Sequence, residues 1–297
     1  MFVANHHLGK FGKEARRPGS PLQWYGGKHS LSRRIVKILP EHDCYCEPML
    51  GGGSLFFTKH PAKVEILNDL DGDLMNFYEH LKDASKRKCL IAALRAVPYS
   101  RQAFRRAGQI TTDPLKRAVN FYIRNRQAFN GRGRETWSYS KKSNKANGWR
   151  NVLNRLKVAG DRLECVQLEC LDCVVVMQKY DGAGTLHFVD PPYPAQTRTK
   201  NSPGLYAHEF SDDKHIEVLE TVKDLAGPVI LCSYESDMYS SRLSDWTLAT
   251  IKVRASGSYH QQRNVKPHRI EALYMNKKAV EHNPNFNSNV FDEIRSL

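Results

Sequence analysis

The stretch TLHFVDPPY, residues 185–193, decides the fold of this chain. Its first five residues form a largely apolar run that predicts a buried strand. The two prolines that follow end the strand and stiffen the turn. Asp190 and Tyr193 therefore stand at the carboxyl end of a strand, where ligands bind in open α/β sheets. Because a strand that ends in a proline turn is common, this stretch alone does not establish a site.

An acid, a rigid turn and an aromatic ring suit transfer of a group to the exocyclic amine of a planar base. Such an amine is a poor nucleophile because its lone pair is delocalised into the ring. Asp190 and the carbonyl of Pro191 can each accept a hydrogen bond from the amine. Together they favour a pyramidal nitrogen with an available lone pair, and the ring of Tyr193 can stack on the base.

A glycine-rich turn follows an earlier strand. Residues 44–50, CYCEPML, predict a strand that runs into GGGS, residues 51–54, and then into an apolar helix at residues 55–57. Glycines there let a ligand approach the backbone closely, although they equally suit a flexible turn. The stretch VEILND, residues 64–69, predicts a second strand that ends in an acid. Asp69 is either a ribose ligand or the N-cap of the next helix.

The positive charge of the chain is concentrated in one segment. Residues 85–160 carry 19 Lys and Arg against two acids, a net charge of +17, whereas the rest of the chain has a net charge of −3. Aromatic residues are interspersed with these cations, which argues against plain disorder. A polyanionic partner explains this segment better than a solvated face does.

In this order, the motifs resemble the Dam-like, alpha-group, S-adenosylmethionine-dependent DNA adenine-N6 methyltransferases. The resemblance covers residues 20–275 and rests on LQWYGGK (22–28), EPMLGGGS (47–54), NDLD (68–71), FYIRNRQAFNG (121–131) and DPPY (190–193). The order of glycine turn, recognition segment and tetrapeptide defines the alpha group. Two features depart from the pattern: a glycine stands at the middle of the turn, where alanine or a similar small residue is frequent, and residues 131–160 do not align.

The resemblance implies an α/β fold with a Rossmann-like methyltransferase sheet, mostly parallel and closed by an antiparallel hairpin. A smaller, mainly helical DNA-recognition domain would be inserted in it. The expected divisions are a poorly ordered basic arm (1–19), a catalytic domain (20–84 and 161–278), a recognition domain (85–160) and a C-terminal tail (279–297).

The implied reaction transfers a methyl group from S-adenosylmethionine to the N6 amine of an adenine flipped out of duplex DNA. No metal is required, because the sulfonium methyl is already activated. The implied catalytic residues are Asp190, Pro191, Pro192 and Tyr193. The implied cofactor-binding residues are Trp24, Lys28, Glu47, Pro48, Gly51, Gly53, Ser54, Asp69, Leu171 and Asp190. Lys28 could instead be a surface charge, as single lysines mostly are.

The basic segment supplies the expected contacts to double-stranded DNA. They are Arg124, Arg126, Asn130, Arg132, Arg134, Lys141, Lys142 and Lys145. Most would meet phosphates, which position the protein without reading sequence. Arg124 would meet either a base edge or a phosphate. A second basic loop, residues 254–269, is either a clamp on the other side of the duplex or a solvated hairpin loop.

Three other functions remain open. Amino methylation of cytosine in DNA uses the same architecture, but a serine in place of Asp190 would favour it. Amino methylation of adenine in RNA would use the same kind of tetrapeptide. A catalytically silent DNA-binding regulator is the third, and the intact Asp190, Tyr193, Gly51 and Asp69 argue against it.

Cysteine usage and hydropathy indicate the compartment. The seven cysteines do not form a secreted framework, and zinc spacing is incomplete. No signal peptide or membrane-length apolar run is visible. We therefore expect no membrane association and a reduced cytoplasm, in a bacterial cell or a phage-infected host. Alpha-group members often act as monomers, and the resemblance leaves open whether a cognate restriction endonuclease accompanies the protein.

Overall fold

A computed structural model describes residues 18–24, 26–29, 31–129, 136–194, 208–254 and 268–284. Within these ranges the chain forms a seven-stranded sheet in the order β3-β2-β1-β4-β5-β7-β6. The strands are β1 (Cys44–Glu47), β2 (Val64–Asn68), β3 (Gln167–Glu169), β4 (Thr185–Val189), β5 (Val229–Ser233), β6 (Thr247–Arg254) and β7 (His268–Met275).

The first five strands are parallel, and β7 runs antiparallel between β5 and β6. This arrangement confirms the predicted fold class, a mostly parallel α/β sheet of the Rossmann-like methyltransferase kind that is closed by an antiparallel hairpin. The strand order reverses between β1 and β4, which are hydrogen-bonded neighbours. Ligands of such sheets bind at the carboxyl ends of the strands at this reversal.

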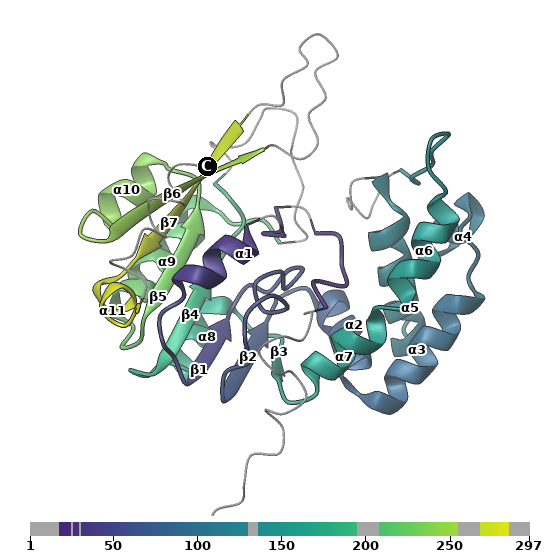
Figure 1. Cartoon of the computed structure of the whole chain (residues 1–297), viewed down its shortest axis with the longest axis horizontal. Helices are drawn as coiled ribbons and strands as arrows, with labels where there is room; N and C mark the ends of the chain where they lie inside the picture. Colours follow the sequence, from purple (N-terminus) through teal and green to yellow (C-terminus); the bar gives the residue numbers. More distant parts are fainter. Residues whose placement is uncertain are drawn as a thin grey trace, which may run out of the picture.

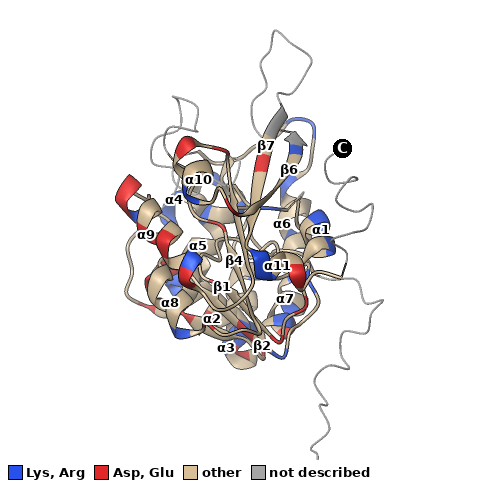
Figure 2. Cartoon of the chain, turned by 90° about the vertical axis from the view of Figure 1, so that its left-hand side faces the viewer, with Lys and Arg blue, Asp and Glu red and all other residues tan. Residues whose placement is uncertain are grey.

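Side chains along each strand alternate between two cores, one on each face of the sheet. Leu186 and Phe188 of β4 point into the larger core, and Val189 points into the smaller one. The smaller core is covered by α8 (Cys173–Lys179) and α9 (Asp212–Asp224). On the opposite side lie α1 (Ser32–Ile35) and α11 (Lys277–Glu281), as Figure 2 shows.

The other helices are η2 (Val36–Ile38), α2 (Gly72–Lys82), α3 (Ala84–Ala96), α4 (Arg101–Arg106), α5 (Pro114–Gln127), α6 (Lys145–Leu153), α7 (Leu156–Leu163) and α10 (Asp237–Arg242). Helices α3 to α7 form a helical lobe to the right of the sheet in Figure 1. Short polar side chains cap the N-termini of three of these helices. Asp83 caps α3, Asn144 caps α6, and Asp113 caps α5, which begins with a proline.

Aromatic contacts join the helical lobe to the sheet. Phe77 of α2 stacks on Tyr122 of α5, with ring centroids 5.2 Å apart, and Tyr122 contacts Trp149 of α6 at 5.7 Å. These rings belong to the same core as the strands, so the lobe shares its core with the sheet. Other aromatic side chains of the basic segment face solvent, because Phe129 is 56% exposed and Tyr139 is 66% exposed.

The apolar helix expected at residues 55–57 is absent, and the chain there runs through successive turns. Gly51 and Gly53 adopt φ values of +48° and +61°, in the left-handed region that favours glycine. The backbone N–H of Phe57 then donates to the carbonyl of Gly53 at 3.0 Å. Within the described ranges, no helix combines the length and the apolar character that a membrane span requires.

Candidate active site

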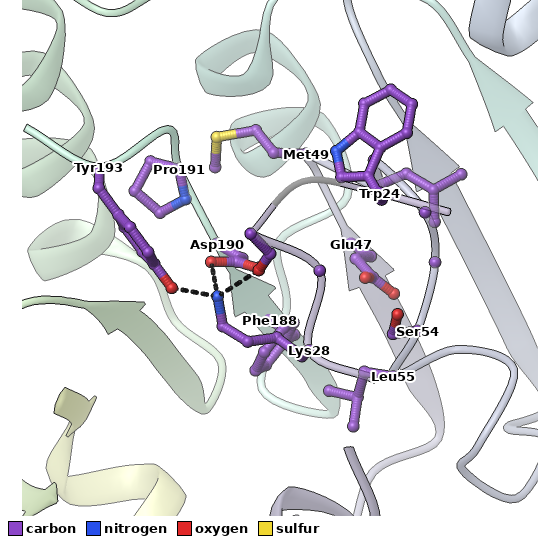
Figure 3. A pocket seen from close by; sticks show the side chains of 16 residues that line it. Trp24, Lys28, Glu47, Met49, Ser54, Leu55, Phe188, Asp190, Pro191 and Tyr193 are labelled. Atoms are coloured by element: carbon purple, nitrogen blue, oxygen red, sulfur yellow. Dashed lines mark hydrogen bonds and ion pairs between the residues drawn. The ribbon is translucent and has the colours of Figure 1, made fainter. Parts of the chain in front are cut away.

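A pocket lies at the carboxyl ends of β1 and β4, where the strand order reverses. Glu47, at the end of β1, and the glycine turn at 51–53 form one side of it. Asp190, Pro191 and Tyr193, which follow β4, form the other (Figure 3). The structure thus brings the two motifs of the sequence into one cavity.

The glycine turn is packed against Trp24. A Cβ atom on Gly51 would lie 2.5 Å from Nε1 of Trp24, and one on Gly52 would lie 2.7 Å from the Cβ of Trp24. Any side chain at these two positions would displace the indole. The close approach that the glycines permit is therefore made by Trp24, which itself lines the pocket.

Asp69 supports the turn from the adjacent strand. The backbone N–H of Gly51 donates to Oδ2 of Asp69 at 2.8 Å, and that of Asp71 donates to Oδ1 at 3.0 Å. Helix α2 is capped by Asp71, so the alternative assignment of Asp69 as the N-cap is wrong. Burial raises the pKa of the Asp69 carboxyl, while the two backbone donors oppose this shift.

Asn68 was not predicted as a site residue, although it stands next to Asp69. Its Nδ2 donates to the carbonyls of Pro48 at 2.8 Å and Leu171 at 3.0 Å, and its Oδ1 accepts from the N–H of Leu171 at 2.9 Å. The buried side-chain amide of Asn68 therefore fixes both the loop after β1, which contains Pro48, and the loop after β3, which contains Leu171. Of the predicted cofactor-binding residues, seven line the described pocket: Trp24, Lys28, Glu47, Gly51, Gly53, Ser54 and Asp190; Pro48, Asp69 and Leu171 do not line it.

Lys28 is 3% exposed, so its alternative assignment as a surface charge is wrong. Its Nζ lies 2.7 Å from Oδ1 of Asp190 and also donates to the hydroxyl of Tyr193. The carbonyl of Gly26 accepts a third hydrogen bond at 3.3 Å. Figure 3 shows the ammonium held between the acid and the ring of the tetrapeptide.

Glu271, on β7, completes this group and was not predicted. It is 6% exposed, and the hydroxyl of Tyr193 donates to its Oε2 at 2.5 Å. The same oxygen lies 3.8 Å from Nζ of Lys28, and the thiol of Cys232 on β5 donates to it at 3.7 Å. The sequence signal for Glu271 is an acid between two apolar residues of a strand, Ile270 and Ala272. An acid that is buried in such a strand needs a partner, which marks it as a candidate site residue.

A family model for the D12 class N6 adenine-specific DNA methyltransferases matches residues 24–255. The chain belongs to this family. This D12-class chain is 26% identical over 272 residues to the DNA adenine methylase of Escherichia coli (strain K12), with 85% of this chain and 94% of that protein covered. It is 29% identical over 216 residues to the DNA N-6-adenine-methyltransferase of Escherichia phage P1, with 69% of this chain and 28% of that protein covered.

Among solved structures, a putative methyltransferase from Streptococcus mutans in complex with SAH has a TM-score of 0.33 and 10% identity to this chain. That likeness covers 82% of this chain and 94% of the other. Family membership confirms the resemblance and makes this D12-class chain an adenine-specific DNA methyltransferase. Of the functions that the sequence left open, the family favours methylation of adenine in DNA.

Two carboxyl groups that line the pocket, those of Asp190 and Glu47, have raised pKa values. Burial raises the pKa of Asp190 to about 6, against the opposing effect of the Lys28 ammonium. Burial also raises the pKa of Glu47 to about 8, although the hydroxyl of Tyr45 donates to it at 2.8 Å. For Lys28, burial acts against the charge, but Asp190, Cys232 and Glu271 outweigh it and hold its pKa well above the ordinary value.

The residues expected to contact DNA fall into three groups. Lys141, Lys142 and Lys145 are exposed at and before the start of α6. Arg124 and Arg126 lie on α5 and are partly buried. The remaining three, Asn130, Arg132 and Arg134, lie outside the described residues, as do residues 255–267 of the second basic loop.

Helix α5 is joined to the pocket through Gln23, the residue before Trp24. The side chain of Asn125 accepts a hydrogen bond from the N–H of Gln23 at 2.9 Å and donates to its carbonyl at 2.7 Å. Gln23 precedes Trp24, so the basic helix and the glycine turn are held through the same short segment.

Proposed function

We propose that the chain transfers the methyl group of S-adenosylmethionine to the N6 amine of an adenine that has been flipped out of duplex DNA. The observation that carries the proposal is the shared pocket, which Glu47 and the glycine turn line together with Asp190 and Tyr193. A paired adenine presents its amine inside the duplex, so the base must leave the stack to reach the carboxylate that lines this pocket.

The residues around the glycine turn fit S-adenosylmethionine. Carboxylates suit a sulfonium cation and ribose hydroxyls, and the indole of Trp24 offers a flat apolar surface. When bound, the cofactor supplies a methyl group that its sulfonium already activates. The residues that would hold it are Trp24, Lys28, Glu47, Pro48, Gly51, Gly53, Ser54, Asp69, Leu171 and Asp190.

Asp190 and the carbonyl of Pro191 would accept hydrogen bonds from the two amine protons. Tyr193 is 5% exposed, and its ring packs on that of Tyr234 with centroids 4.3 Å apart, so the ring is held in a fixed position at the pocket, where the flipped base would stack on it. Pro192 keeps the turn rigid. The amine nitrogen would receive the methyl group that the bound cofactor supplies, and Asp190 or water would take the proton that the nitrogen loses. Positioning supplies most of the rate increase.

The helical lobe would dock on the duplex. Its exposed lysines, Lys141, Lys142 and Lys145, would meet phosphates, as would Arg124 and Arg126 on α5. We extend the proposal to Asn130, Arg132 and Arg134 from the sequence. In this division of labour, residues 20–84 and 161–278 carry the chemistry and residues 85–160 bind DNA. We extend the proposal to a cytoplasmic location, which bacterial and phage relatives suit, and to a monomer, which rests on the family resemblance alone.

Methylation of unmethylated genomic DNA by the purified protein tests the proposal. S-adenosylmethionine with a labelled methyl group would be supplied, and the modified bases would be mapped at base resolution. We expect label on adenine N6 at a defined sequence. Label on cytosine, preference for RNA in a competition, or no transfer would contradict the proposal. When 2-aminopurine replaces the mapped adenine, its fluorescence should increase on binding of the protein, because the base leaves the stack.

A further inference from the structure

We propose that Glu271 is a positioning residue that takes over the Lys28 ammonium when the target amine reaches Asp190. The proposal rests on the proposed function, because it concerns entry of the amine into the same pocket. We call Lys28, Asp190, Tyr193 and Glu271 the Lys28 cluster.

The ammonium of Lys28 stands where an amine would bind. Its Nζ lies 2.7 Å from Oδ1 of Asp190, which is the distance that an N–H donor takes to a carboxylate. Both residues line the pocket, so an amine that binds Asp190 there must share its carboxylate with the ammonium or displace the ammonium. The ammonium therefore occupies one of the acceptor positions of Asp190 that a neutral amine would use.

A second carboxylate stands within reach of the same ammonium. Oε2 of Glu271 is 3.8 Å from Nζ of Lys28, beyond hydrogen-bond distance but close enough for an ion pair. A shift of about 1 Å would convert it into a hydrogen bond, which a flexible lysine stem allows. The hydroxyl of Tyr193 accepts from Lys28 and donates to Glu271, so it bridges the path between them.

Charge explains why the second carboxylate is needed. The cluster holds one cation and two acids, and Lys28 and Glu271 are each less than one-tenth exposed. If a neutral amine displaced Lys28 from Asp190, the ammonium would keep only the neutral acceptors Tyr193 and Gly26, and a buried ammonium without a carboxylate is costly. Glu271 keeps the ammonium paired with and without the amine. The other groups that face the cluster are Cys232 on β5, Glu47 on β1 and the carbonyl of Gly26.

The substitution Glu271→Gln isolates this role, because glutamine keeps an oxygen for Tyr193 and loses only the charge. We expect kcat to fall by about tenfold to about a hundredfold, with the KM for S-adenosylmethionine and the affinity for DNA unchanged. Glu271→Asp, which keeps the charge, should recover most of kcat. If the glutamine variant does not fold, the aspartate variant gives a smaller loss in the same direction.

The pH profile distinguishes this role from a structural one. Asp190 must be ionised to accept the amine, and the charge of Glu271 raises its pKa. The acid limb of kcat should therefore move to lower pH in Glu271→Gln. In Lys28→Met, which removes the cation that opposes this rise, the limb should move to higher pH.

Glu65→Gln is the matched control, because Glu65 is a carboxylate 5% exposed that also pairs with a lysine, away from the pocket. It should lower Tm without moving the acid limb. A Glu271→Gln enzyme with wild-type kcat and a wild-type acid limb of the pH profile would overturn the role of Glu271 but not the proposed function. A loss of kcat without a shift of the acid limb would do the same. A wild-type protein that does not methylate adenine overturns the proposed function instead.

Discussion

Two groups of charged side chains lie at opposite ends of the parallel strands, and they differ in how their charges are paired. At the carboxyl ends of the strands, Lys28 is shared between Asp190 and Glu271 at 2.7 and 3.8 Å. Near the amino end of β2, Glu65 is held by two cations. Its Oε1 lies 2.7 Å from Nζ of Lys59 and 2.7 Å from Nη2 of Arg162, and its Oε2 lies 2.5 Å from Nη1 of Arg162.

The difference separates a structural cluster from a reactive one. Both oxygens of Glu65 are engaged, and although burial raises its pKa, Arg162 and Lys59 outweigh burial and lower it. In the Lys28 cluster the acids outnumber the cation, one contact is too long for a hydrogen bond, and the pKa of Asp190 is raised to about 6. Saturated bonding holds the fold, whereas incomplete bonding beside a pocket leaves an acceptor for a ligand.

The largest effect should come from Asp190→Ala. We expect kcat to fall by about a thousandfold, because the amine loses the group that orients it. Affinity for duplex DNA should stay within about twofold, since phosphate contacts on the helical lobe carry it. Single-turnover methylation and a binding titration measure the two quantities, and a variant with normal turnover would remove Asp190 from the mechanism.

Glu65→Gln should act on stability instead. Loss of its charge leaves Lys59 and Arg162 buried without their partner, so the free energy of unfolding should drop by about 3 kcal/mol. Turnover per folded molecule should not change. Urea unfolding, monitored by circular dichroism, measures the drop. A loss of kcat without a loss of stability would contradict the structural role of Glu65.

The two clusters should also differ in their response to pH. Because Asp190 has a pKa raised to about 6, kcat should fall about tenfold per pH unit below that value as the carboxylate protonates. The pKa of Glu65 is lowered, so its contribution to stability is present above the ordinary glutamate pKa and is lost as the pH falls through the folded value. Glu65→Gln should therefore destabilise the protein less at pH 3 than at pH 7, which thermal melts at both pH values would show.

The smallest effect should come from one exposed lysine of the helical lobe. Lys142→Ala should reduce the slope of log affinity for DNA against log salt by about one. Lys277→Ala on α11 is the matched control, since that lysine is 87% exposed and outside the basic segment, and it should leave the slope unchanged. Equal slopes for wild type and Lys142→Ala would place the docking surface elsewhere.

Prediction from the sequence succeeded where the signal was local. Strand β4 with its proline turn and the acid that follows β2 both depend on neighbouring residues. The apolar helix at residues 55–57 failed because the left-handed backbone at Gly51 and Gly53 sets up turns instead. Glu271 and the contact of Asn125 with Gln23 were missed, because their partners lie 78 and 102 residues away along the chain.

The sequence by itself determined the α/β class, the family and the separation of a basic segment from the rest, since apolar periodicity, motif order and charge are properties of the linear chain. Only the tertiary structure decided which charges share a cavity. Lys28, Asp190 and Glu271 come from three distant segments, and their protonation depends on mutual distance and on exclusion of water, which exist only once the strands have packed.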